Sequence, residues 1–120
     1  MSKLKQTIKI TTPDTSISTQ DRGLNYGDGF FTTASVVNSV VEHWDLHKTR
    51  LEECAQRLFF PELDLTAIER EVNHAISDTQ TGILKIVITR GAGGRGYGLP
   101  DTPSIQVLIS IMHAVSHYKR

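Results

Sequence analysis

Two glycine-rich loops and one helical arginine are the parts of this sequence whose residue types could do chemistry. Arg50 lies in the run His47-Lys48-Thr49-Arg50-Leu51, and the loops span residues 22–29 and 91–98. Glycine permits backbone angles that are closed to other residues, so both loops carry shape requirements. A guanidinium matches the geometry of phosphate and carboxylate groups. An anion-binding site is one interpretation of this set.

Each of these features also has a simpler interpretation. The loop at residues 91–98 has no Lys-Ser or Lys-Thr ending and opens no helix, which argues against a nucleotide P-loop. Its two arginines lie in a neutral chain, so an arginine-glycine nucleic-acid segment is disfavoured, and a plain flexible hairpin loop stays open. Arg50 borders the expected buried stripe of its helix, where it is either a solvated arginine or an anion clamp.

Metal binding and nucleophilic catalysis find little support among the remaining residues. Among the five histidines, His43 and His47 are four residues apart, a metal-like spacing, but this pair straddles an expected strand-to-helix junction, so we reject zinc. No serine lies in a Gly-x-Ser-x-Gly elbow. Cys54 is expected to be a small core residue. We therefore expect neither a metal ligand nor a serine-elbow nucleophile in this chain.

The composition bounds the class of protein. The chain has 120 residues, which suits one domain over residues 1–120, and its 13 basic and 13 acidic residues cancel. A neutral chain has no general attraction for nucleic acid or an anionic membrane. One cysteine excludes an internal disulfide, no apolar run approaches a membrane span, and the start lacks the apolar region of a signal peptide. We expect a cytoplasmic location.

The elements that must position these residues follow from hydrophobic periodicity and turn signals. Strands are expected at residues 4–11, 30–37, 40–44, 83–89 and 105–112. Asn38-Ser39 indicates a short hairpin turn. The order of strand, hairpin, two helices and hairpin predicts an α+β fold with a largely antiparallel sheet and both helices on one face.

Two helices are expected between the hairpins. Asp45 could cap the first helix and Thr66, in a capping box with Glu69, the second. The predicted buried stripes are Leu51, Cys54, Ala55 and Leu58 in the first helix, and Ile68, Val72, Ala75 and Ile76 in the second.

Taken together, these motifs closely resemble the amino-terminal domain of fold type IV pyridoxal-phosphate enzymes. The resemblance rests on residues 21–33, on His47-Lys48-Thr49-Arg50-Leu51, and on Ile88-Thr89-Arg90-Gly91 followed by Gly94-Arg95-Gly96-Tyr97, and it covers essentially the whole chain. The group includes branched-chain aminotransferases, D-amino acid aminotransferases and 4-amino-4-deoxychorismate lyases. Residues 27–34, 54–58, 82–85 and 91–97 look most like the lyase branch.

The resemblance implies roles for individual residues. It places the cofactor phosphate on Arg50 and the ring beside the substrate at Phe31, where D-amino acid aminotransferases carry tyrosine. Arg95 and Tyr97 match a loop that binds substrate carboxylate in related enzymes, sometimes across a dimer. Thr32 and Thr33 could add hydroxyl contacts or be structural strand residues.

A departure from the family concerns its catalytic lysine, which lies in the carboxyl-terminal domain of those enzymes. No lysine of this chain lies in a matching motif, and Lys85 is interpreted as a sheet residue. The resemblance therefore implies one half of a two-domain, homodimeric enzyme of folate synthesis that converts 4-amino-4-deoxychorismate to 4-aminobenzoate and pyruvate. This half is expected to lack its partner, the carboxyl-terminal domain. Alone it is expected to have no catalytic residue, to be inactive and not to hold pyridoxal phosphate stably.

Two alternatives stay open beside this interpretation. One is a fragment of a branched-chain or D-amino acid aminotransferase, which transfers an amino group to a 2-oxo acid instead of releasing pyruvate. The other is a standalone dimerisation or binding module with no cofactor.

Overall fold

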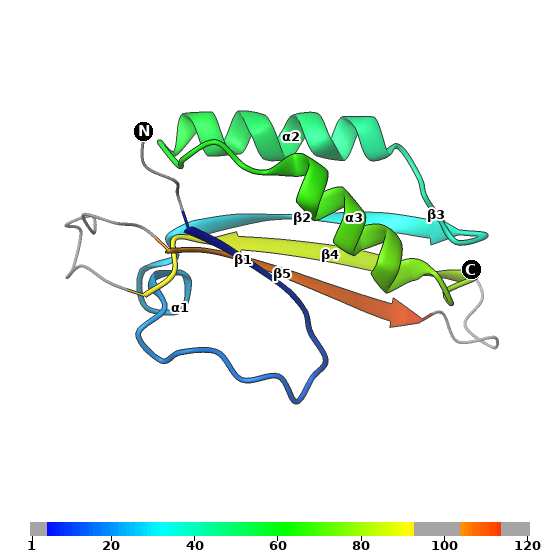
Figure 1. Cartoon of the computed structure of the whole chain (residues 1–120), viewed down its shortest axis with the longest axis horizontal. Helices are drawn as coiled ribbons and strands as arrows, with labels where there is room; N and C mark the ends of the chain where they lie inside the picture. The colour runs from blue at the N-terminus through cyan, green and yellow to red at the C-terminus, as the bar shows by residue number, and fades with distance from the viewer. Residues whose placement is uncertain (1–4, 93–103, 114–120) are drawn as a thin grey trace.

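A five-stranded sheet forms one layer of the computed structural model, which describes residues 5–92 and 104–113. The strands are β1 (Lys5–Ile10), β2 (Gly29–Val37), β3 (Val40–Val41), β4 (Thr81–Thr89) and β5 (Ser104–His113). Their order across the sheet is β1-β5-β4-β2-β3. Every neighbouring pair is antiparallel except β1 and β5, so the largely antiparallel sheet is confirmed (Figure 1).

Two helices form the second layer. Helix α2 (Trp44–Arg57) and helix α3 (Leu65–Ile76) lie on the same side of the sheet, as predicted (Figure 1). A third, short helix, α1 (Arg22–Tyr26), lies near the end of β4 and was not predicted. The α+β fold class is therefore confirmed, with one added helical turn inside the first glycine-rich loop.

The core lies between the sheet and helices α2 and α3. Alternate residues of β2 and β4 are buried, as expected for strands with one covered face. The innermost side chains share near-zero exposure and come from both layers. They are Val36, Leu51, Ile68, Val72, Leu84, Ile86, Ile88, Ile105, Val107 and Ile109.

The hairpin between β2 and β3 is also confirmed. Asn38 and Ser39 have φ angles of 53° and 60°, the left-handed values that a tight two-residue hairpin turn needs. The second strand is shorter than predicted, because β3 ends at Val41 and the chain enters α2 at Trp44.

Both predicted helix caps are wrong. Helix α2 begins after His43, which takes a left-handed φ of 58° and makes no side-chain cap bond, while Asp45 lies inside the first turn. Helix α3 begins after Asp64, whose carboxylate accepts a hydrogen bond of 3.0 Å from the Ala67 amide. Asp64 thus takes the capping position two residues before Thr66, and the threonine lies inside the first turn of the helix.

The predicted buried stripes are largely right. Leu51 and Ala55 are buried in α2, and Ile68, Val72 and Ile76 are buried in α3. Cys54 and Ala75 are only half-buried, so Cys54 lies at the margin of the core instead of inside it. Leu58 is exposed at 42%, because it is the residue that ends α2.

The side of the sheet away from α2 and α3 is called the open face below. Neighbouring strands place matching residues on it, so that Phe31 lies beside Val87 and Leu108, and Thr33 lies beside Lys85 and Ser110. Phe31 is 58% exposed there. This face therefore presents apolar and cationic side chains together.

The core predicts a contrast between two leucines of helix α2. Substituting the fully buried Leu51 by alanine should lower the free energy of unfolding by about 2–5 kcal/mol, because it leaves a cavity between helix and sheet. Leu46→Ala is the matched control, since that side chain is 67% exposed and should cost less than about 0.5 kcal/mol. Urea denaturation of both variants measures the difference; equal losses would contradict the packing described.

Candidate functional site

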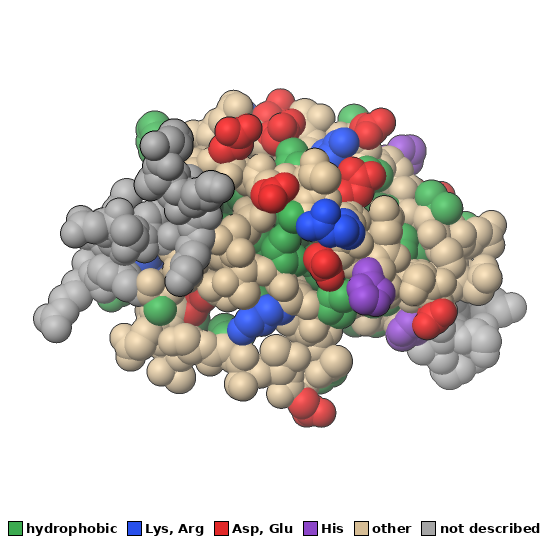
Figure 2. Space-filling view, viewed as in Figure 1, with side chains coloured by type: hydrophobic (Ala, Val, Ile, Leu, Met, Phe, Trp, Pro, Cys, Tyr) green, Lys and Arg blue, Asp and Glu red, His purple; other side chains and the backbone are tan. Residues whose placement is uncertain are grey.

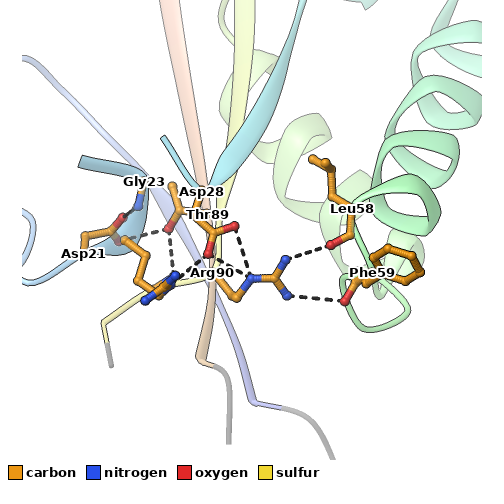
Figure 3. A network of polar contacts seen from close by, with 9 residues as sticks. Asp21, Gly23, Asp28, Leu58, Phe59, Thr89 and Arg90 are labelled. Atoms are coloured by element: carbon orange, nitrogen blue, oxygen red, sulfur yellow. Dashed lines mark hydrogen bonds and ion pairs between the residues drawn. The ribbon is translucent and has the colours of Figure 1, made fainter. Parts of the chain in front are cut away.

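A buried ion network holds the first glycine-rich loop in place. The Asp28 carboxylate accepts from Arg22 Nε at 2.8 Å and from Arg90 Nε at 3.0 Å (Figure 3). Both arginine side chains are nearly inaccessible to solvent. Because a buried guanidinium without a counter-charge is costly, this single carboxylate ties the loop to the end of β4.

Arg90 extends the network to the end of helix α2. Its Nη2 donates to the Leu58 carbonyl at 2.8 Å and its Nη1 to the Phe59 carbonyl at 3.3 Å. Its guanidinium also lies 4.0 Å from the centre of the Phe60 ring. Figure 3 shows Arg90 between Asp28 on one side and the carbonyl groups of Leu58 and Phe59 on the other, although these residues are far apart in sequence.

Asp21 anchors the short helix α1 to the same strand end. Its carboxylate accepts from the Gly23 amide at 2.7 Å and from the Thr89 hydroxyl at 2.9 Å. A side chain at Gly23 would meet Thr89 at 2.5 Å, so glycine is required for this close approach. The shape requirement of this loop is thus explained by internal contacts.

Arg50 has a different environment. It lies in helix α2 with an exposed side chain and forms no ion pair with any residue of the described part of the chain. Lys48, two residues earlier, is instead within ion-pair distance of Asp45 and Glu69. The guanidinium of Arg50 is therefore available to an external anion.

His47 lies one helical turn before Arg50 and contacts the sheet. Its Nδ1 is 2.8 Å from the hydroxyl of Thr32, a buried residue of β2. Burial lowers the pKa of His47, and the positive charges of Arg50 and His43 lower it further. Its surroundings therefore favour the uncharged form of the ring.

Phe31 lies on the open face, above an apolar hollow of about 290 Å³. The hollow is lined by Leu24, Val87 and Leu108 among others. Lys85 places its Nζ 4.9 Å from the centre of the Phe31 ring, and no acidic side chain in the described residues pairs with it. This side of β2 can thus receive an anion with an apolar body.

The predicted contacts lie on two sides of one strand. Phe31 faces the open side, whereas Thr32, the next residue of β2, faces His47 on α2, the helix that carries Arg50. On the side of β2 away from β4, strand β3 pairs only with Val36 and Val37. In the described structure, the part of β2 before Val36 therefore has no strand on that side. Arg50, on α2, and Phe31, on the open face, therefore lie on opposite sides of β2, and Arg95 and Tyr97 lie outside the described residues.

The described residues show two further absences. They contain no group of three or more histidine, cysteine or acidic side chains that could hold a metal ion. Within the same residues, no helix is both long and apolar enough to cross a membrane.

Comparison with known proteins places this chain in a family. Residues 29–119 match the model of the amino-transferase class IV family, so the chain belongs to that family. It is 36% identical over 107 residues to an aminodeoxychorismate lyase of Vibrio harveyi, covering 88% of this chain and 39% of that relative. The chain therefore spans well under half the length of this relative.

Solved structures show the same fold. A 4-amino-4-deoxychorismate lyase from Pseudomonas aeruginosa superposes with a TM-score of 0.74 at 36% identity, over 85% of this chain and 37% of that one. A hypothetical aminotransferase from Mycobacterium tuberculosis, in its PLP-bound form, gives a TM-score of 0.71 at 24% identity, over 91% and 38% of the two chains. The fold is thus that of the small amino-terminal domain of fold type IV enzymes, as predicted.

Sequence reasoning missed the supporting residues of this site. The sequence alone indicates only an acidic loop residue at Asp28 and a rejected zinc ligand at His47. It indicates a sheet residue at Lys85. The alternation of residues 83–89 places Lys85 on the same face as Val87, which is a signal that could have found it. The partners of Asp28 and His47 come from distant segments and needed the fold.

The ion network predicts that Asp28→Asn is strongly destabilising. The amide would remove the carboxylate charge that pairs with both buried guanidinium groups, at a cost of about 3–5 kcal/mol in the free energy of unfolding. Asp14→Asn, in an exposed loop, removes the same charge and should change stability by less than about 0.5 kcal/mol. Urea denaturation at neutral pH compares them, and similar stabilities would refute the role assigned to Asp28.

Proposed function

We propose that this chain supplies one wall of the active site of a pyridoxal-phosphate-dependent aminodeoxychorismate lyase, which converts 4-amino-4-deoxychorismate to 4-aminobenzoate and pyruvate. One observation carries the proposal. A free guanidinium lies on the helix side of β2, and an aromatic ring with a free amine lies on the other side. The identity to relatives named as aminodeoxychorismate lyases supports this choice within the family.

Arg50 fits the phosphate group of the cofactor. Its side chain is exposed and unpaired in the described structure, and a guanidinium binds phosphate through paired hydrogen bonds. Pyridoxal phosphate, when bound, supplies the electron-accepting ring for the elimination. The contribution of this chain is to hold and orient the cofactor by its phosphate.

The open face fits the substrate. Aminodeoxychorismate combines an apolar ring with two carboxylates, and Phe31 with the adjoining hollow offers an apolar surface. Lys85 offers a positive charge within reach of the same ring. Arg95 and Tyr97 remain proposed carboxylate contacts on the basis of their sequence motif.

The lysine that bonds covalently to the cofactor belongs, in this proposal, to a carboxyl-terminal domain outside residues 1–120. Lys48 interacts with acidic neighbours and Lys85 lies over Phe31, so neither is assigned that role. We propose a cytoplasmic homodimer for the whole enzyme, with a place in folate synthesis, and no catalytic activity for this chain alone.

The whole protein that carries this chain should release pyruvate from 4-amino-4-deoxychorismate when loaded with pyridoxal phosphate. Arg50→Met should weaken cofactor binding about 10- to 100-fold, because a charged hydrogen bond is lost. Arg57→Met, an exposed arginine on the same helix, is the control and should bind normally. Coupled pyruvate detection and cofactor absorbance measure both effects; amino transfer to a 2-oxo acid without pyruvate release would favour an aminotransferase.

The open face predicts a separate effect of Lys85→Met on substrate binding. The KM for 4-amino-4-deoxychorismate should rise about 10- to 100-fold with kcat nearly unchanged, because the amine contacts a carboxylate away from the reacting atoms. Lys9→Met removes another exposed cation from the same face, on β1, and should stay within about threefold of the parent. Steady-state kinetics decide, and equal effects of the two variants would contradict the role of Lys85.

A further inference from the structure

Helix α2 carries a row of three basic side chains with no acidic partner in the described structure. His43 lies at its amino-terminal cap, and His47 and Arg50 follow four and seven residues later, so the three are neighbours on one helix face. The nearby Asp45 and Glu69 carboxylates lie by Lys48 instead. The row therefore combines the fixed positive charge of Arg50 with two histidines, and no acidic side chain of the described residues pairs with it.

The hydrogen bond to Thr32 determines which part of the His47 ring remains for a ligand. Because Nδ1 contacts the Thr32 hydroxyl at 2.8 Å, only Nε2 is left to contact another group. Thr32 is only 4% exposed and lies in β2, which packs against α2. The hydrogen bond to this buried side chain therefore fixes the orientation of the His47 ring. In histidines, the hydrogen bond made by one ring nitrogen determines the role of the other nitrogen.

We infer that His47 completes the anion clamp of Arg50, with Thr32 as the residue that positions its ring, and that anion binding is coupled to uptake of one proton by His47. The inference rests on the proposed phosphate role of Arg50 and extends it to a second side chain. It makes His47 and Thr32 parts of the cofactor-phosphate site.

The electrostatics of the row support this coupling. Burial, then Arg50, then His43 lower the pKa of His47, and strand β2 behind it contributes no charged residue over Gly29–Val37. An anion beside Arg50 would offset the repulsion from that arginine and raise the pKa of His47. By linkage, affinity for the anion must then rise as pH falls through the range in which His47 takes up its proton.

Sulfate is a suitable probe because its charge does not change between pH 8 and about pH 5.5, unlike that of a phosphate ester. Calorimetry on the whole protein, without pyridoxal phosphate, should show sulfate binding about tenfold tighter at the lower pH, the size of one unit of pKa shift. His47→Gln should bind with little pH dependence. His43→Gln is the matched control and should keep the dependence of the parent protein.

A second measurement needs no substitution at His47. The ring resonances of His47, followed by NMR against pH, should show a higher pKa with sulfate than without it, and Thr32→Val should reduce the difference. An equal pH dependence in the parent and His47→Gln proteins, or a His47 pKa unmoved by sulfate, would overturn the inference.

The arginine variant separates this inference from the proposed function. If Arg50→Met abolishes sulfate binding while His47→Gln leaves its pH dependence intact, Arg50 keeps its proposed role and the coupling to His47 is refuted. If Arg50→Met binds sulfate as the parent does, the phosphate role of Arg50 fails, and the clamp inferred from it fails too.

Discussion

The contact on which the rest of the site depends is the Asp28 carboxylate between Arg22 and Arg90. It brings together the loop before β2, the end of β4 and, through Arg90, the turn after helix α2. These are the segments that bracket Phe31 and fix the carboxyl end of the helix carrying Arg50. A buried carboxylate with two guanidinium partners tolerates little displacement, because moving it would weaken two buried ion pairs at once. The network therefore sets the geometry of the candidate site through contacts within the chain.

Strand β2 divides the candidate site into two halves. Because successive strand residues point to opposite faces, Phe31 and Thr32 serve different surfaces although they are adjacent in sequence. Phe31 belongs to the open face with Lys85, and Thr32 supports His47 beside Arg50. A shift of β2 by one residue would exchange the two roles, so the register with β4 is as important to the site as the residue types.

The sequence was sufficient where local pattern controls structure and insufficient where distant segments meet. Period-two and helical spacings predicted most strands and both long helices, and Asn38-Ser39 predicted the turn correctly. The caps were missed because several residues near each helix start could serve, and packing selects among them. The partners of Asp28 and the Thr32–His47 contact join residues far apart in sequence, so no local pattern could predict them. Arg50 and Phe31 were placed by family resemblance, and their chemical roles remain proposals.

Whether a charge is compensated distinguishes the structural cations from those available to ligands. Arg22 and Arg90 are buried against Asp28 and belong to the framework. Arg50 and Lys85 are exposed, and neither has an acidic partner in the described part of the chain, although the chain as a whole is neutral. An exposed cation next to an apolar surface gains little stability for the fold, so its use lies with an anion from outside. On that reasoning the exposed cations on the two sides of β2, rather than the buried ones, are the basis of the proposed anion site.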